Sequence, residues 1–276
     1  MENNRVWLIT GASQGLGLAM VKYLLQKDQT VVVTTRNKCR FDSSLLDHPN
    51  LEVHELDLTS ENDTRDTVGQ IFKKYGRIDT LMNNAGYGFV GAIEETSAEE
   101  AEKVIDINVH ATLRMTRLVL PHMRKRGSGH ILNLSSIAGL IGSPGWGIYN
   151  ASKFAIEGIS EALYHELKDL GIKVTMIEPG AIRTNFLGGS LASSELIIAD
   201  YAETVGKRRT ILAGNNGKQP NDPEKTVIAI YKMVQSDTPP MRLLLGKDAY
   251  DRAMQNLEDV RAKFETMKDL TFSTGF

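Results

Sequence analysis

Cysteine and long apolar runs are the scarcest features of this 276-residue chain, and each absence limits what it can be. The one cysteine, Cys39, has no disulfide partner and no nearby Cys/His cluster, which excludes a disulfide framework and argues against a redox or metal role. No stretch approaches the ~18 consecutive apolar residues of a membrane span, and the apolar run after Arg5 is too short for a signal sequence. We therefore expect a cytoplasmic protein without a membrane span.

The chain also lacks a surplus of either charge. Its 32 Lys and Arg residues nearly balance 34 Asp and Glu residues, which gives a formal net charge of −2. This balance does not favour nucleic acid or an anionic membrane as the main partner. The six histidines show no metal-ligand spacing with cysteines or carboxylates, so no metal is expected. The hydrophobic share of 41% is ordinary for a globular protein with a substantial core.

Short β-branched apolar runs alternate with longer amphipathic stretches along the chain. Helical spacing of apolar residues predicts helices at 15–27, 60–75, 98–125, 149–169, 222–236 and 247–267. The runs between them predict strands at 5–10, 30–35, 51–56, 78–82, 130–134, 172–178 and 241–245. This alternation indicates a parallel sheet covered by helices on both faces. We therefore expect an α/β fold, a three-layer, doubly wound parallel sheet of the Rossmann type, in a single domain spanning residues 1–276.

Residues 185–221 interrupt this alternation. The segment is rich in glycine, has helical character around 193–209, and is long for a connection inside a compact domain. Because such segments are often functional, we expect it to form a lid over a substrate site. Its basic run, Lys207-Arg208-Arg209, is interpreted as a solvated helix face, and contact with an acidic carrier is the alternative.

The sequence TGASQGLG at residues 10–17 joins the first strand to the first helix. Glycines at 11, 15 and 17 allow a tight turn and close approach to a phosphate, which the N–H groups and positive dipole end of the helix favour. The second strand ends at Thr35-Arg36, where NAD-selective Rossmann domains carry an acidic residue. Because Arg36 can instead pair with a 2′-phosphate, the sequence favours NADP(H), with NAD(H) possible.

Tyr149 and Lys153 share one face of a predicted helix. A cation about 4 Å from a phenol contributes roughly 4 kcal/mol at an effective dielectric of 20, which is about three pKa units and would bring a tyrosine near 7. Ser135 and Ser136 follow a strand whose end should line the ligand crevice, where a serine can bind a substrate oxygen. Asn108, apolar-flanked and in mid-helix, is either a satisfied core amide or part of a proton relay.

Together these residues resemble the short-chain dehydrogenase/reductase family over about residues 5–187. The resemblance is carried by TGASQGLG at 10–17, Asp57-Leu58, Asn83-Asn84-Ala85-Gly86, Asn108, Ser136, Tyr149 with Lys153, Pro179-Gly180 and Thr184. It implies hydride transfer between a nicotinamide and a carbonyl or alcohol carbon, with Tyr149 as acid/base. Ser136, 13 residues before Tyr149, would polarise the oxygen, Lys153 would lower the tyrosine pKa and hold the nicotinamide ribose, and Asn108 would complete a water relay.

The resemblance also implies the binding residues. Those for the cofactor would be Gly11, Ser13, Gln14, Gly15, Leu16, Gly17, Arg36, Asp57, Leu58, Asn83, Asn84, Ala85, Gly86, Tyr149, Lys153, Pro179, Gly180, Ile182 and Thr184. Asp57 would bind the adenine, and Thr184 the nicotinamide carboxamide. Ser136, Tyr87, Trp146 and Phe186 are the candidates for contact with substrate, together with Phe89, Ile141 and Leu187.

An apolar pocket of this kind suits a mid-sized ketone such as a steroid, a retinoid-like chain or an aromatic ketone. The C-terminal third resembles the 17β-hydroxysteroid and retinol dehydrogenase branch, through Leu243-Leu244-Leu245-Gly246 and the charged last helix. Two alternatives stay open: a dinucleotide-sensing module without turnover, and a 3-oxoacyl-carrier reductase. The family resemblance further implies a homodimer or homotetramer through the helices at 98–125 and 149–169.

Overall fold

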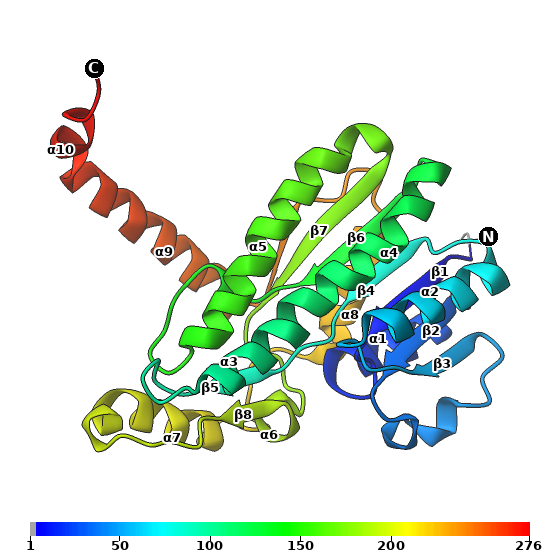
Figure 1. The fold of residues 1–276 in the computed structure, drawn as a ribbon, viewed down its shortest axis with the longest axis horizontal. Helices are drawn as coiled ribbons and strands as arrows, with labels where there is room; N and C mark the ends of the chain where they lie inside the picture. Colours follow the sequence, from blue (N-terminus) through cyan, green and yellow to red (C-terminus); the bar gives the residue numbers. More distant parts are fainter. Residues whose placement is uncertain (1–3) are drawn as a thin grey trace.

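The computed structural model describes residues 4–276 and contains a seven-stranded parallel sheet of order β3-β2-β1-β4-β6-β7-β9 (Figure 1). The strands are β1 (Val6–Thr10), β2 (Thr30–Thr35), β3 (Leu51–Glu55), β4 (Thr80–Asn83), β6 (Gly129–Leu134), β7 (Ile172–Pro179) and β9 (Arg242–Leu245). The main helices are α1 (Gly15–Leu25), α2 (Glu61–Tyr75), α3 (Ala98–Ile105), α4 (Ala111–Arg126), α5 (Gly147–Leu167), α8 (Pro223–Val234) and α9 (Lys247–Thr266). The predicted single-domain, doubly wound α/β fold is thus confirmed.

The helices cover the two faces of the sheet because each strand is apolar on both sides. In β1, Trp7 and Ile9 belong to the apolar cluster under α1 and α8, whereas Val6 and Leu8 belong to the cluster under α2, α4 and α5. Successive side chains of a strand point to opposite faces, so a continuous apolar run fills both layers. The chain lays β2 and β3 on one side of β1 and then crosses to β4 on the other. The carboxyl ends of β1 and β4 therefore meet at a topological switch point, where α/β sheets bind ligands.

Local signals fix the ends of the helices. The Ser60 side chain accepts a hydrogen bond from the N–H of Asp63 at the start of α2, and Gly76 ends the helix with φ +71°. Ser97 and Glu100 form a reciprocal capping box at the start of α3. Each device satisfies backbone groups that a helix end leaves unpaired.

Three features differ from the sequence expectation. The helix predicted at 98–125 is interrupted by a π-helical turn at Asp106–His110. Two three-residue strands, β5 (Gly88–Val90) and β8 (Leu191–Ser193), form a second, small parallel sheet that was not predicted. After α9 the chain continues into α10 (Lys268–Phe272), and the two helices project from the body of the molecule (Figure 1). Within residues 4–276, no helix is long and apolar enough to cross a membrane.

Candidate active site

The glycine loop after β1 packs tightly against the end of β4. Asn84 Nδ2 donates to the carbonyl oxygens of Thr10 and Gly11, both at 2.9 Å. A Cβ at Gly11 would lie 2.7 Å from Ala85 Cα, and one at Gly17 would lie 2.5 Å from Asn84 Nδ2. Only glycine fits these positions, so the glycines and the Asn83–Gly86 segment form one structural unit at the switch point.

We expect Gly11→Ala to disrupt this unit. Gly11 has φ +64° and its added Cβ would overlap backbone, so the loop must shift. The substitution should therefore weaken dinucleotide binding and lower the melting temperature. Gly69→Ala in α2 is the matched control, because its Cβ would meet nothing within 4 Å and alanine favours a helix by about 0.5–1 kcal/mol. Equal dinucleotide affinity in Gly11→Ala and wild type, measured by calorimetry, would contradict this account.

The start of α1 is suited to an anion. Gln14, the N-cap residue, makes no side-chain cap, and its amide instead donates to Ser190 Oγ at 2.7 Å. The first N–H groups of α1 are thus not capped by this side chain, and the positive end of the helix favours a phosphate. Ser13 and Leu16 belong to the same turn. This loop, with its two left-handed glycines at 11 and 15, fits the pyrophosphate of a dinucleotide.

Two charged side chains lie farther along the same edge of the sheet. Arg36 follows β2 and is exposed, and Asp57 follows β3. The backbone N–H and hydroxyl of Thr59 bind the Asp57 carboxylate at 2.9 and 2.8 Å and lower its pKa, with a smaller contribution from the Arg36 charge. Leu58 beside it is buried. The roles of Arg36 toward a 2′-phosphate and of Asp57 toward the adenine stay predictions.

Tyr149, Ser136 and Lys153 come together at the carboxyl end of β6. Tyr149 is 7% exposed and is hydrogen-bonded to the Ser136 side chain. Lys153, one turn farther along α5, places Nζ 5.7 Å from the Tyr149 ring centroid and donates to Leu134 O at 2.7 Å. A Cβ at Gly86 would lie 3.8 Å from the same Nζ, so the lysine bridges the tyrosine and the cofactor-side segment. Ser136, and not Ser135, contacts the phenol.

Burial shifts both titratable groups in this cluster. It raises the pKa of Tyr149 to about 12, although the Ser136 hydrogen bond acts in the opposite direction. It lowers the pKa of Lys153 to about 8, against the attraction of Glu157. The sequence argument that Lys153 brings the tyrosine pKa near 7 is wrong for this geometry, because Nζ points to a carbonyl oxygen. At neutral pH, Tyr149 therefore keeps its proton and Lys153 is predominantly cationic.

Asn108 lies in the π-helical turn and its amide is saturated. Oδ1 accepts from the N–H of Tyr87 at 3.0 Å, while Nδ2 donates to Tyr87 O at 3.0 Å and to Ser152 Oγ at 3.1 Å. Of the two sequence interpretations, these contacts favour the satisfied core amide. Asn108 holds the backbone beside Gly86 in place, and its role in a proton relay stays a prediction.

The segment after β7 is braced by an aspartate that sequence reasoning missed. Asp248 Oδ2 accepts from the N–H of Ala181 at 2.8 Å, and a Cβ at Gly180 would lie 2.3 Å from its carboxylate. Asn221 Nδ2 donates to Asp248 Oδ1 at 2.7 Å. This bracing positions the chain from Pro179 through Ile182 to Thr184, whose Oγ1 lies 4.0 Å from where a Gly15 Cβ would be. The segment predicted to bind the nicotinamide end thus faces the glycine loop.

Only some of the predicted substrate residues surround Tyr149. The rings of Trp146 and Phe186 lie 5.0 and 6.0 Å from the Tyr149 ring, centroid to centroid. Two expectations are corrected: Phe89 is buried in the small sheet, and Ile141 packs against the root of α9. A three-residue strand has no readable period and α9 lies about 100 residues away, so neither packing could be recognised from the sequence. Tyr87 and Leu187 are partly buried.

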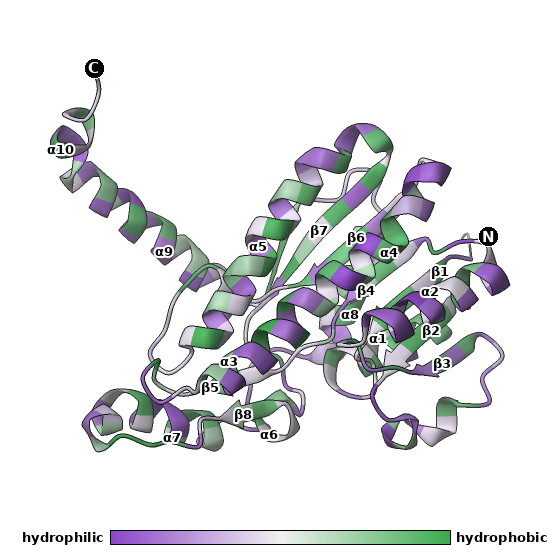
Figure 2. Cartoon of the chain, viewed as in Figure 1, coloured by the Kyte–Doolittle hydropathy of each residue, from purple (hydrophilic) through white to green (hydrophobic). Residues whose placement is uncertain are grey.

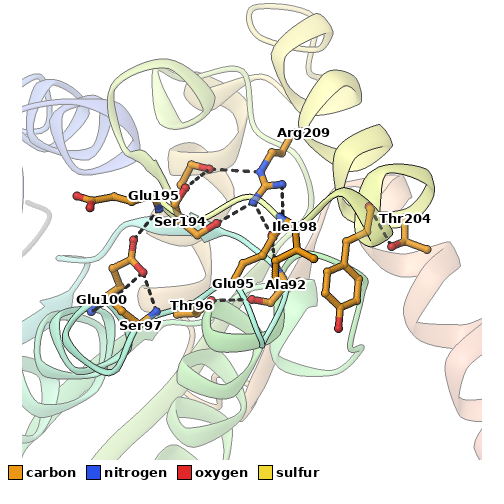
Figure 3. Close-up of polar contacts among 12 residues, drawn as sticks. Ala92, Glu95, Thr96, Ser97, Glu100, Ser194, Glu195, Ile198, Thr204 and Arg209 are labelled. Carbon is orange, nitrogen blue, oxygen red and sulfur yellow. Dashed lines mark hydrogen bonds and ion pairs between the residues drawn. The ribbon is translucent and has the colours of Figure 1, made fainter.

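The connecting segment (residues 185–221) is held down by a buried ion pair (Figure 3). Arg209 Nη2 lies 2.7 Å from Glu95 Oε2 and donates to Ser194 Oγ at 2.7 Å. Burial alone would raise the pKa of Glu95, but hydrogen bonds from Arg209 and from the N–H groups of Ile198 and Ala92 lower it to about 2. The expectation that residues 207–209 form a solvated face is therefore wrong for Arg209, whose partner is internal.

We expect Arg209→Met to loosen the connecting segment. Removing one partner of a buried ion pair costs about 3–5 kcal/mol, because the other charge stays buried alone. Here the loss should be local, seen as faster thermolysin cleavage within 185–221 than in wild type. Lys207→Met is the control, since Lys207 pairs with Glu203 one turn away and both are exposed. Equal cleavage rates for the two variants would show that the Arg209–Glu95 ion pair does not hold the connecting segment in place.

Comparison with known proteins decides the family. The short chain dehydrogenase family matches residues 5–194. This chain belongs to that family. A short-chain dehydrogenase from Streptomyces avermitilis superposes with a TM-score of 0.94 at 38% identity, over 99% of this chain and 100% of the other. A 3-ketodihydrosphingosine reductase of Bacteroides thetaiotaomicron is 36% identical over 88% of each chain. The structure described as ElxO with NADP bound matches at 26% identity and a TM-score of 0.72, over 88% of this chain and 96% of ElxO.

The protein is thus a short-chain dehydrogenase/reductase and an NAD(P)-dependent oxidoreductase. Its glycine loop lies at the switch point between β1 and β4, and the tyrosine–lysine pair and the serine lie at the carboxyl end of the neighbouring strand β6. In the part of the chain from residue 4 onward, no group of three or more His, Cys, Asp or Glu side chains is arranged to hold a metal ion.

Proposed function

We propose that this enzyme reduces a ketone on a mid-sized apolar molecule, with NADPH as the reductant. The observation that carries the proposal is the buried Tyr149 hydroxyl, which is hydrogen-bonded to Ser136 and stays protonated at neutral pH. When bound, the nicotinamide supplies the hydride. Ser136 hydrogen-bonds and polarises the substrate oxygen, and Tyr149 donates its proton to that oxygen. Lys153 holds the nicotinamide ribose.

Arg36 supports NADP(H) over NAD(H). Its guanidinium is exposed at the end of β2, where it can pair with a 2′-phosphate through two parallel hydrogen bonds. A relative, ElxO, has been solved with NADP. Asp57 and Leu58 complete the adenine side of the proposed site, and the glycine loop and the Pro179–Thr184 segment bind the remainder.

Replacing Arg36 by Ala should raise KM for NADPH about tenfold or more and leave KM for NADH within about twofold. A charge-assisted hydrogen bond to phosphate contributes roughly 1.5–3 kcal/mol to binding. NADH has no 2′-phosphate, so its binding should not depend on this contact. Arg40→Ala, the same substitution four positions farther along the chain, is the control. Equal changes in KM for both cofactors would show that Arg36 does not read the 2′-phosphate.

The substrate proposal rests on what surrounds Tyr149. Trp146 and Phe186 give the site apolar, aromatic walls, and the connecting segment that contributes Phe186 would close over a substrate as a lid. The Bacteroides relative is named for reduction of 3-ketodihydrosphingosine, a ketone on a long apolar chain. Membership in the 17β-hydroxysteroid and retinol dehydrogenase branch would point to similarly apolar substrates. We therefore propose a mid-sized apolar ketone, rather than a short polar one, as the substrate.

The test is turnover by the purified protein with NADPH and NADH against long-chain, steroid, retinoid, aromatic and short-chain ketones. Oxidation of NADPH with at least one apolar class supports the proposal. Tight NADPH binding without turnover on any class would instead support a sensing module. A carrier-bound 3-oxoacyl substrate is disfavoured, because the basic run offers it only Lys207 and Arg208 once Arg209 is engaged by Glu95. We further propose that the enzyme acts as a homodimer or homotetramer.

A further inference from the structure

The C-terminal arm (residues 247–272, α9 and α10) leaves the body of the molecule after its first two turns (Figure 1). Its root is packed: Ala249 and Ala253 are buried beside Ile137, and Asn256 Nδ2 donates to Leu140 O at 3.2 Å. Beyond the root, large apolar side chains are exposed. They are Leu257 (61%), Phe264 (73%), Met267 (51%), Leu270 (63%) and Phe272 (69%). Apolar surface gathered in this way marks a contact site.

The apolar side chains of the arm follow a coiled-coil period. Steps of three and four residues alternate along Tyr250, Ala253, Leu257, Val260, Phe264 and Met267. This spacing keeps one apolar seam along a helix and is the pattern by which one helix packs against another. In the first two turns of the arm, the seam residue Ala253 packs against the body of the molecule. Farther out, the same seam has no partner within the described chain. The partner therefore offers a helix.

The charges of the arm also indicate which kind of partner it binds. Residues 247–270 carry five basic and six acidic side chains, mixed with the apolar ones (Figure 2). A helix that lies on an anionic membrane has a polar face rich in Lys and Arg, which this arm lacks. The charge is also unevenly divided: residues 247–259 hold two basic side chains and three acidic ones besides Asp248, which Ala181 and Asn221 bind, and residues 260–270 hold three basic and two acidic ones. An antiparallel copy of the arm complements this division.

We propose that the arm pairs antiparallel with the arm of a second copy of this chain, about a two-fold axis. The acidic root half of each arm then meets the basic outer half of the other, and the seams face one another. Each buried aromatic side chain covers about 150–250 Å², so Tyr250, Phe264 and Phe272 from two copies, with Leu257 and Met267, bury on the order of 1,000 Å². That reaches the lower limit for a specific interface of the isologous kind.

The first test is the mass of the full-length protein by sedimentation velocity. Leu257→Glu/Phe264→Glu puts two charges into the seam and should halve the sedimenting mass. Ala262→Glu is the matched control, because it adds the same side chain on the opposite face of the exposed arm and should leave the mass unchanged. Circular dichroism confirms that the helices are retained. An unchanged mass in the seam variant would overturn the proposal, and so would binding of a monomeric wild type to phosphatidylglycerol vesicles.

The second test addresses the antiparallel arrangement. Arg261→Glu/Lys263→Glu makes the outer half acidic, and Glu258→Lys/Asp259→Lys makes the root half basic. Each variant alone should associate about tenfold more weakly than wild type, because like charges then face each other. Mixed in equal amounts, the two should associate as tightly as wild type, since both contacts again join opposite charges. Failure of the mixture to recover the wild-type mass would overturn the antiparallel pairing.

Discussion

Tyr149→Phe should lower kcat for ketone reduction by about 10²–10⁴-fold, the range that a positioned general acid contributes. The variant keeps the ring packed between Trp146 and Phe186 and removes only the hydroxyl that Ser136 binds. We therefore expect NADPH affinity and melting temperature close to wild type. The measurement is kcat by NADPH absorbance, with cofactor affinity by fluorescence on the same samples.

The matched control is Tyr164→Phe on the same helix. Tyr164 packs at the edge of the apolar cluster under α2, α4 and α5, far from the serine and the lysine along α5. Its loss should change kcat by less than about twofold if proton donation is specific to Tyr149. A Tyr149→Phe enzyme within threefold of wild-type kcat, on any ketone that the wild type reduces, would remove the tyrosine from the mechanism.

Arg242→Met should cost the fold about 3–5 kcal/mol at pH 9, the usual loss when one partner of a buried ion pair is removed. The Arg242 guanidinium contacts Glu157 and lies 2.6 Å from Glu178 Oε1. The Glu157 and Glu178 side chains are 7% and 1% exposed. Without the arginine, two buried carboxyl groups lose the guanidinium that they contact. The measurement is the free energy of unfolding in urea.

The cost of Arg242→Met should shrink as the pH falls. Burial, followed by the neighbouring Glu157, raises the pKa of Glu178 from 4.5 to about 8. A raised folded-state pKa gives stability that is fully present below the unfolded value of 4.5 and is lost as pH rises through about 8. At pH 5.5 Glu178 is protonated with or without the arginine, whereas above pH 8 it ionises and needs the cation. Arg77→Met is the control, because Arg77 is 47% exposed and its partner Asp79 keeps a second arginine, Arg126. An Arg242→Met penalty that is equal at pH 5.5 and pH 9 would contradict this assignment.

The sequence predicted the sheet well because its strands are apolar on both faces and regularly separated by helical spacing. Val31, Val32 and Val33 are all fully buried, as a central parallel strand requires. The glycine loop and Ser136 could also be placed, since the carboxyl ends of parallel strands meet at one edge. These features follow from residue patterns within some 20 consecutive positions, so they can be recognised from the sequence alone.

Contacts between distant segments could not be read in the same way. Glu95 and Arg209 are 114 positions apart, and nothing in either neighbourhood marks them as partners. Asp248 was equally hidden, because it braces the Pro179–Thr184 segment from the far end of the chain. The prediction for the pKa of Tyr149 was wrong for another reason. Sequence spacing places Lys153 on the right face of α5, but its rotamer, which sends Nζ to Leu134 O, is set by packing.

The central claim is that a hydride passes from NADPH to a ketone carbon while Tyr149 supplies the proton. The most direct measurement uses NADPH with deuterium at both positions of nicotinamide C4, with mass spectrometry of the product alcohol. We predict one deuterium on the carbinol carbon with wild-type enzyme and at least about 10²-fold less labelled alcohol in the same time with Tyr149→Phe. Bound and unconsumed deuterated NADPH with every ketone class, in wild type and variant alike, would contradict the account.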